Sequence, residues 1–370
     1  MTTGDFEIFL AAPPGLEPVL AEEARAEGFA LPRPVPGGVE TRGGWSEVWR
    51  ANLVLRGASR VLVRIGEFRA FHLAQLDKRA RKFPWGDYLR PDVPVKVEVA
   101  TNRKSKIYHA GAAAQRLERA IADTLGAPIG EDGVTLKARI EDNLVILSLD
   151  SSGEPLHRRG HKQAVSKAPM RETLAALFLR QCGYDGTEPV LDPMCGSGTF
   201  PIEAAEIAAG LLPGRTRSFA FERFAGFDAE AWAHLKTTGT IRTPGVLFHG
   251  SDRDQGAIRM AAENAERSGV AAWTRFDCRS VADLERPDGP PGLVMVNPPY
   301  GARIGNKKLL FGVYAQLGEV LKARFSGWRV GMVTSEKALA TASGLPFLPT
   351  GAPVPHGGLK VVLYRTGVLG

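Results

Sequence analysis

"PVLDPMCGSGTFPIEAAEIAAG", residues 189–210, sets the fold class of the second half of this chain. A short apolar run ends at Asp192, a Gly-Ser-Gly turn occupies 196–198, and Pro201 lies near the start of an apolar helix, where its missing N–H costs little. This order exposes backbone N–H groups at the helix start, where they can bind a carboxylate or phosphate. The stretch predicts the first β–α unit of a doubly wound α/β sheet with a ligand at the turn.

The turn differs from two common nucleotide-binding signatures. It does not match G-x-x-x-x-G-K-[ST], which argues against a phosphate-cradling NTPase loop. It also lacks G-x-G-x-x-G with an acid about 20 residues further on, so a nicotinamide site fits badly. The next acid at the end of a strand pattern is Asp252, beyond an insertion at 213–245.

Strand and helix patterns alternate from residue 171 onward, as in a parallel sheet. The candidate strands are "PVLDP", "GVLFHGSD", "AWTRFD", "GLVMVNP", "RVGMVTS" and "LKVVLYRT". Asp252 ends the second strand, where a carboxylate can accept from both ribose hydroxyls, and Asp277 ends the third, near which an adenine amino group can bind. Each acid could instead cap the following helix; for the helix after Asp252 we expect Asp254 to be the cap.

"LVMVNPPYG", residues 293–301, ends another apolar strand with an unusual group. Pro298 and Pro299 have no N–H, so their carbonyls can point into a ligand cleft together with the side-chain oxygen of Asn297. Tyr300 adds an aromatic face for a flat ring. Such acceptors fit an exocyclic amine on a planar base and would aim its lone pair at an electrophile. The alternative is a Pro-Pro turn that merely ends a strand.

The first half of the chain predicts smaller α+β units. Strand, helix, strand and helix patterns fill the first sixty residues, with a Pro/Gly-rich loop at 31–38. A second α+β unit follows, and it ends in two strands joined by a turn at Glu141–Asn143. The polar, basic stretch after it, 151–169, predicts a linker between the two halves.

Composition indicates a globular chain with a basic excess. The 370 residues are 44% hydrophobic and carry a net charge of +7, which suggests two or three domains and a polyanionic partner. No apolar run reaches the roughly 18–20 residues of a membrane span, and the N-terminus is a poor signal peptide. The 3 cysteines lie far apart and the 7 histidines form no ligand pattern, so we expect a cytoplasmic protein without a metal.

Positive charge is concentrated in a few stretches, "DKRARKF" at 77–83, "TNRKSK" at 101–106 and "HRRGHK" at 157–162. A charge run is usually only a solvated face, but the surplus is uneven along the chain. The candidate phosphate contacts are Lys78, Arg79, Arg81, Lys82, Arg103, Lys104, Lys106, Arg158, Arg159 and Lys162. Tyr108 and Trp85 lie beside these stretches and could stack on unpaired bases, although core packing is the better interpretation for Trp85.

The motifs together resemble one family, the THUMP-domain class I S-adenosylmethionine-dependent RNA guanine-N2 methyltransferases, which act on 23S rRNA or tRNA. The resemblance rests on "DPMCGSGT", "NPPYG", "GSDRDQGAIRMAAENAERSGV" and, in the first half, "GLEPVLAEE" and "KSKIYH". It implies a ferredoxin-like domain at 1–59, a THUMP domain at 60–154, a linker at 155–170 and a Rossmann-like methyltransferase domain at 171–370. The first two would bind RNA.

The resemblance also implies roles for the residues at the predicted sheet edge. The cofactor S-adenosylmethionine would be held by Asp192, Pro193, Cys195, Gly196, Ser197, Gly198, Thr199, Asp252, Asp277 and Asn297. The target guanine would be held by Asn297, Pro298, Pro299 and Tyr300. Three alternatives stay open: a tRNA guanine-N2 methyltransferase, a DNA adenine-N6 methyltransferase, and a catalytically inactive RNA-binding assembly factor. The sequence does not indicate an oligomeric state.

Overall fold

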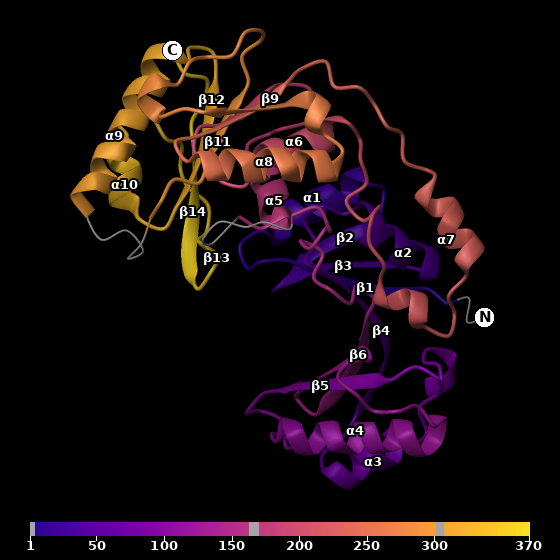
Figure 1. The fold of residues 1–370 in the computed structure, drawn as a ribbon. Helices are drawn as coiled ribbons and strands as arrows, with labels where there is room; N and C mark the ends of the chain where they lie inside the picture. Colours follow the sequence, from indigo (N-terminus) through magenta and orange to yellow (C-terminus); the bar gives the residue numbers. More distant parts are fainter. Residues whose placement is uncertain (1–3, 163–169, 301–306) are drawn as a thin grey trace. The chain divides into compact units, whose positions relative to one another are not determined.

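The computed structural model describes residues 4–162, 170–300 and 307–370, which divide into two compact units (Figure 1). The first unit comprises Met1–Ala12, Ala21–Leu156 and Arg217–Thr238, and the second comprises Pro13–Leu20, His157–Thr216 and Gly239–Gly370. Each unit contains one seven-stranded sheet. The predicted combination of α+β and doubly wound α/β architecture is therefore confirmed.

The sheet of the first unit has the strand order β2-β3-β1-β4-β7-β6-β5. Its strands are β1 (Phe6–Ala11), β2 (Ala30–Val35), β3 (Gly38–Gly43), β4 (Arg60–Arg69), β5 (Val95–Thr101), β6 (Val134–Glu141) and β7 (Leu144–Asp150). The long strand β4 pairs with β1 over residues 60–64 and with β7 over residues 62–69. The predicted boundary at 59/60 thus lies just before a strand that pairs on both sides, so the two predicted N-terminal domains would share one sheet.

Local sequence signals explain most elements of this unit. In β1, Phe6, Ile8 and Leu10 are buried while the residues between them are partly exposed, the alternation of a strand with one buried face. The helices are α2 (Trp45–Val54), α3 (Leu73–Ala80) and α4 (Ala110–Leu125), together with α1 (Glu17–Ala26), whose residues 17–20 are assigned to the second unit. Gly126, with φ +79°, ends α4 in the left-handed conformation that glycine adopts without strain.

One sequence-based expectation for this unit is wrong. The stretch 31–38 was expected to be a loop, but it contributes most of β2, the edge strand paired with β3. Pro32 and Pro34 are tolerated because an edge strand has one side that needs no backbone donor. A register shift between Ala30 and Arg33 interrupts the pairing, as in a β-bulge.

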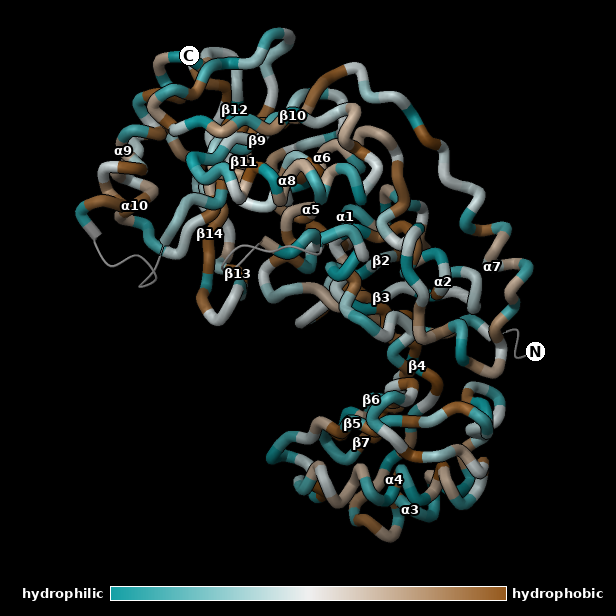
Figure 2. Tube along the Cα trace, in the orientation of Figure 1, coloured by the Kyte–Doolittle hydropathy of each residue, from teal (hydrophilic) through white to brown (hydrophobic). Residues whose placement is uncertain are grey.

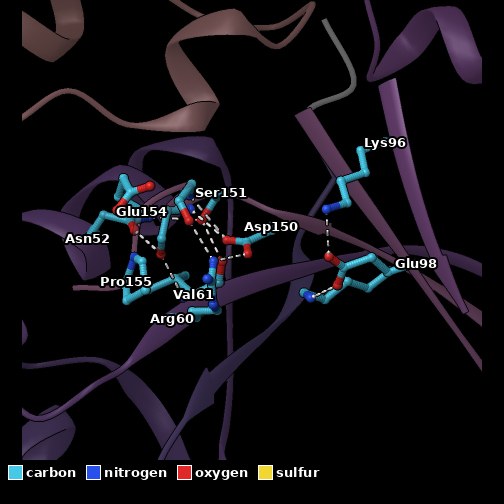
Figure 3. Close-up of polar contacts among 12 residues, drawn as sticks. Asn52, Arg60, Val61, Lys96, Glu98, Asp150, Ser151, Glu154 and Pro155 are labelled. Atoms are coloured by element: carbon cyan, nitrogen blue, oxygen red, sulfur yellow. Dashed lines mark hydrogen bonds and ion pairs between the residues drawn. The ribbon is translucent and has the colours of Figure 1, made fainter. Parts of the chain in front are cut away.

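A buried polar network closes the end of β7 (Figure 3). Asn52 Nδ2 donates to Ser151 Oγ at 2.9 Å, and Ser151 Oγ donates to the Val61 carbonyl at 2.7 Å. Arg60 forms an ion pair with Asp150. Burial raises the pKa of Asp150, although Arg60 opposes the shift. The network fixes α2, β4 and β7 to one another within the first unit.

A segment from late in the sequence, Arg217–Thr238, also belongs to the first unit. It contains a 3₁₀ turn, η2 (Ala220–Arg223), and a short helix, α7 (Ala229–Lys236). The Phe221 ring lies 6.1 Å from Trp49 of α2 and 5.0 Å from Trp232 of α7. All three side chains are buried, so this aromatic cluster completes the core of the unit.

The sheet of the second unit has the strand order β10-β9-β8-β11-β12-β14-β13. Its strands are β8 (Val190–Asp192), β9 (Phe248–Asp252), β10 (Thr274–Cys278), β11 (Leu293–Val296), β12 (Arg329–Thr334), β13 (Val354–His356) and β14 (Leu359–Arg365). The first five in spatial order are parallel, and β14 runs antiparallel to both of its neighbours. This is a doubly wound sheet with an antiparallel edge.

Helices cover this sheet and build its core. They are α5 (Glu172–Gln181), α6 (Thr199–Ala208), α8 (Gln255–Ser268), α9 (Lys307–Arg324) and α10 (Lys337–Ala342). Val296, Tyr314 and Met332 lie in one buried cluster that joins β11, α9 and β12. In Figure 2, brown, apolar stretches lie along β14. Within the described ranges, no helix is long and apolar enough to cross a membrane.

Candidate active site

Four parallel strands bring the predicted site residues to one edge of the second sheet. Asp192 is the last residue of β8, Asp252 is the last of β9, Asp277 lies one residue before the end of β10, and Asn297 directly follows β11. These strands are neighbours in the order β10-β9-β8-β11, about 4.8 Å apart, so their carboxyl ends meet. The glycine turn and Asn297 therefore follow adjacent strands at the same edge, as the sequence predicted.

The glycine turn is tight and linked to the neighbouring strand. Gly196 and Gly198 have φ of +51° and +82°, and a Cβ on Gly198 would lie 3.0 Å from that of Ala261. Gly196 N donates to Asp252 Oδ2 at 3.1 Å, so the turn and the predicted ribose acceptor are in direct contact. The helix α6 starts immediately afterwards at Thr199. The other Asp252 oxygen accepts from Asp254 N at 3.0 Å, and Asp254 caps α8, as expected.

Acidic charge is concentrated at this turn. Burial raises the pKa of Asp192 well above its usual range, and Asp252 adds to the shift. Asp192 Oδ1 accepts from Met194 N at 3.0 Å, and the turn itself supplies no cation. A ligand with positive charge, such as a sulfonium with an α-ammonium group, would compensate these carboxylates.

Two predicted cofactor residues take different places around the turn. The Cys195 side chain is buried and packs with Ile258, Ala261 and Phe276, while its backbone N–H donates to the Ser251 carbonyl at 2.9 Å. Asp277 is exposed and, together with Arg279, lines an open cavity of ≈ 630 Å³. This cavity is large enough for a planar base.

The Asn-Pro-Pro-Tyr corner holds an unused acceptor. Asn297 Oδ1 is buried and has no hydrogen-bond partner among the described residues. A buried acceptor without a donor is costly, and a ligand N–H would satisfy it. The unpaired oxygen therefore fits a ligand whose amino group donates a hydrogen bond to it.

Tyr314 in α9 holds this corner, and sequence reasoning missed it. The Tyr314 hydroxyl donates to the Pro299 carbonyl at 3.3 Å and lies 3.0 Å from Thr334 Oγ1 at the end of β12. Its side chain is fully buried, and burial raises its pKa. The signal in the sequence was a single tyrosine in the otherwise apolar face of a helix.

The segment 157–162 does not fit the RNA-contact prediction. Arg159 is only 2% exposed and forms ion pairs with Glu203 and Glu206 of α6. Glu203 and Glu206 outweigh the effect of burial, which opposes the charge, so the pKa of Arg159 is raised. A paired, buried guanidinium cannot reach a phosphate, and this prediction for Arg159 is wrong.

Lys162 is also built into the second unit. Its Nζ donates to the Met170 carbonyl at 2.7 Å and to Thr199 Oγ1 at 2.8 Å, and it lies 3.4 Å from Glu172. Burial lowers its pKa, although Glu172 opposes the shift. Lys162 therefore supports the first residue of α6 and is not free for RNA, whereas Arg158 is exposed. Residues 163–169 of the predicted linker lie outside the described residues.

The basic residues of the first unit fall into two groups at opposite ends of α3 and α4. Lys78, Arg79, Arg81 and Lys82 lie at the end of α3. Arg81 is paired with Asp77 and with Asp123, near the end of α4. Arg103, Lys104 and Lys106 precede α4, whose 16 residues span about 24 Å. The sequence did not separate these groups.

Comparison with known proteins identifies the family. Residues 159–346 match the model of the RMKL-like methyltransferase domain, and residues 7–62 match that of the RlmL ferredoxin-like domain. A Synechocystis protein named as a candidate RNA methyltransferase is 33% identical over 95% of this chain and 94% of its own length. The chain belongs to the RMKL-like methyltransferase family.

Further relatives agree with this assignment. The "Ribosomal RNA large subunit methyltransferase K/L" of Methylococcus capsulatus is 34% identical over 93% of this chain, which spans 48% of that relative. A candidate methyltransferase crystallised with S-adenosylhomocysteine superposes with a TM-score of 0.86 and 26% identity, over 100% of both chains. The S-adenosylhomocysteine bound to this neighbour and the methyltransferase family match support S-adenosylmethionine as the cofactor of this chain, and the turn, Asp192 and Asp252 fit the charge and the ribose of that cofactor.

Proposed function

We propose that this chain transfers a methyl group from S-adenosylmethionine to the exocyclic N2 of a guanine in structured RNA, and that the RNA is 23S rRNA. The observation that carries the proposal is the buried Asn297 Oδ1, which has no donor within 4–162, 170–300 and 307–370, at the sheet edge next to the glycine turn. The chain spans about half the length of the K/L relatives, whose names supply the ribosomal substrate. The site of action would be the cytoplasm.

Each residue of the proposed site has its own role in the reaction. Asn297 Oδ1 and the carbonyl of Pro298 accept the two hydrogens of the guanine amine, which turns the nitrogen lone pair away from the ring. Tyr300 stacks on the base, and Tyr314 fixes the corner through Pro299. The bound cofactor supplies an electrophilic methyl group on a positively charged sulfur.

The same acceptors stabilise the amine as positive charge develops on it. The proton then leaves to water, so the site needs no strong base. Asp192 and Asp252 remain at the cofactor turn and orient the ligand there. The first unit, with its exposed cations, binds the RNA.

Asn297→Ala tests the proposal. We expect methyl transfer to 23S rRNA to fall at least about a hundredfold, because positioning and charge stabilisation are both lost. S-adenosylmethionine binding, measured by isothermal titration calorimetry, should stay within a few-fold of wild type. Gln316→Ala, an exposed amide of α9, is the matched control and should retain activity. Activity of Asn297→Ala close to wild type would contradict the assigned role.

The product distinguishes the alternatives. Nucleoside digests with mass detection should show N2-methylguanosine in RNA from cells with this gene and less of it without the gene. N6-methyladenine in DNA would support the DNA methyltransferase, and methylguanosine confined to tRNA would support the tRNA enzyme. Absence of heat on titration with S-adenosylmethionine would support an inactive assembly factor.

A further inference from the structure

Three loops of the first unit meet at the end of the unit where α3 and α4 begin. We call residues 69–72, 102–109 and 142–143 the tip loops. Lys106 N donates to Asn143 Oδ1 at 2.8 Å, and Ala70 N donates to the Asn143 carbonyl at 2.9 Å. Ser105 Oγ donates to the Ile140 carbonyl at 3.2 Å. Asn143, at φ +63°, thus ties the other two loops together.

The tip loops expose two aromatic rings. Tyr108 is 75% exposed and Phe71 is 41% exposed, whereas Trp85, at the other end of α3, is buried. Lys106 Nζ lies 5.5 Å from the centre of the Phe71 ring. Aromatic side chains usually bury most of their area, so exposed rings on a fixed loop are typical of a binding surface.

The charge of the tip loops is strongly positive. Arg69, Arg103, Lys104 and Lys106 are exposed, and Asp142 is the single acid of these segments. Arg103, Lys104 and Lys106 form no ion pair with any of the described residues, in contrast to Arg81 at the other end of the helices. Unpaired cations are available for phosphates.

We propose that the tip loops bind an unpaired nucleotide of the RNA substrate, with Tyr108 stacked on its base and Arg103, Lys104 and Lys106 on the flanking phosphates. An aromatic face beside free cations matches single-stranded RNA, whose bases are open to stacking; in duplex RNA they are not. The proposal rests on the proposed RNA substrate and adds where and how the first unit holds it.

The experiment compares two RNA probes. One is a hairpin with a single-stranded 3′ extension, and the other is the same hairpin with a blunt end. The full-length protein is titrated into each fluorescent RNA at fixed salt, and anisotropy gives Kd. Tyr108→Ala should weaken binding of the extended hairpin about tenfold and leave the blunt hairpin unchanged, while Tyr108→Phe retains wild-type affinity. Because Tyr108 is exposed, thermal unfolding should be unchanged.

A charge control and an activity measurement separate the outcomes. Arg116→Ala removes an exposed cation from the middle of α4 and should leave both affinities within about twofold of wild type. Equal binding of both probes by wild type, or unchanged binding by Tyr108→Ala, would overturn the tip site. The wild-type methyl transfer assay on 23S rRNA is scored separately, so the catalytic proposal can stand when the tip proposal fails.

Discussion

Two basic stretches of similar composition have opposite environments. In "NRKSK", residues 102–106, the cations are exposed and unpaired with described residues. In "HRRGHK", residues 157–162, Arg159 is buried and Lys162 is partly buried, and both bind carboxylates or carbonyls. Composition predicted phosphate contacts for both; the structure contradicts the prediction for Arg159 and Lys162, and the contacts of the first stretch and of Arg158 stay a prediction.

The difference arises from acids far along the chain. Glu203 and Glu206 lie about one helical turn apart on α6. Both carboxylates are buried, so they need a positively charged partner in the interior. Arg159 supplies it from 44 residues upstream of Glu203. A charge run therefore indicates a nucleic-acid contact only when no acid elsewhere in the fold pairs with it.

Arg159→Met tests this contrast with the largest expected effect. It leaves Glu203 and Glu206 without their buried cation, and we expect the free energy of unfolding to fall by about 3–5 kcal/mol. Arg103→Met, its exposed counterpart, should change stability by less than about 0.5 kcal/mol. Urea unfolding of both variants measures the difference. Equal stabilities would show that burial does not distinguish the two stretches.

Lys162→Met should have the next largest effect. The ammonium holds Thr199 Oγ1 and the Met170 carbonyl, and loss of these charged hydrogen bonds should cost about 1.5–3 kcal/mol. Because Thr199 begins α6, the affinity for S-adenosylmethionine should also fall. Calorimetric titration and urea unfolding check both expectations. Lys104→Met is the exposed control, and unchanged cofactor affinity in Lys162→Met would contradict a supporting role.

The contrast extends to the tyrosines. Tyr314→Phe removes the donor to Pro299 and should lower kcat about tenfold, equivalent to about 1.4 kcal/mol, with cofactor affinity unchanged. Tyr108→Phe at the exposed tip keeps the ring and should not change kcat. If Tyr314→Phe lowered the affinity for the cofactor and left kcat unchanged, the Tyr314 hydroxyl would act on cofactor binding and not on the Asn-Pro-Pro-Tyr corner.

Asp192 is a buried carboxyl group with no cation beside it among the described residues. The stability of the protein should therefore depend on pH. Burial raises its pKa in the folded state, so wild type loses stability as pH rises from about 3.8 through that raised pKa. The Asp192→Asn variant has no ionisable group at this position, so it does not lose this stability as the pH rises. Without cofactor, the variant should gain stability relative to wild type as the pH increases from 4 to 8. A constant difference in melting temperature across this range would argue against the assignment.

The smallest effect concerns salt. Arg103→Ala/Lys104→Ala should reduce the slope of log affinity for RNA against log salt by about 1.5, since each phosphate contact contributes about 0.7–0.9. Stability should not change. Anisotropy titrations at several salt concentrations provide the slope, and an unaltered slope would remove these residues from the RNA contact.

The sequence predicted the parts that local rules determine. The glycine turn, the Asp254 cap, the β6–β7 turn and the edge that collects Asp192, Asp252 and Asn297 follow from motifs a few residues long. The predictions that were wrong or missing concern residues whose environment is determined by partners distant in the sequence. The prolines of β2 suggested a loop because its edge position was not visible, and Arg159 and Tyr314 acquire their roles from Glu203 and Pro299.

The aromatic segment 217–238 has a consequence for synthesis on the ribosome. Its Phe221 and Trp232 complete a core whose other residues precede position 157. At about 5–20 residues per second, translation from Leu156 to Thr238 takes on the order of ten seconds. During that interval the nascent chain holds Trp49 without its final aromatic neighbours, a state in which chaperones can recognise it.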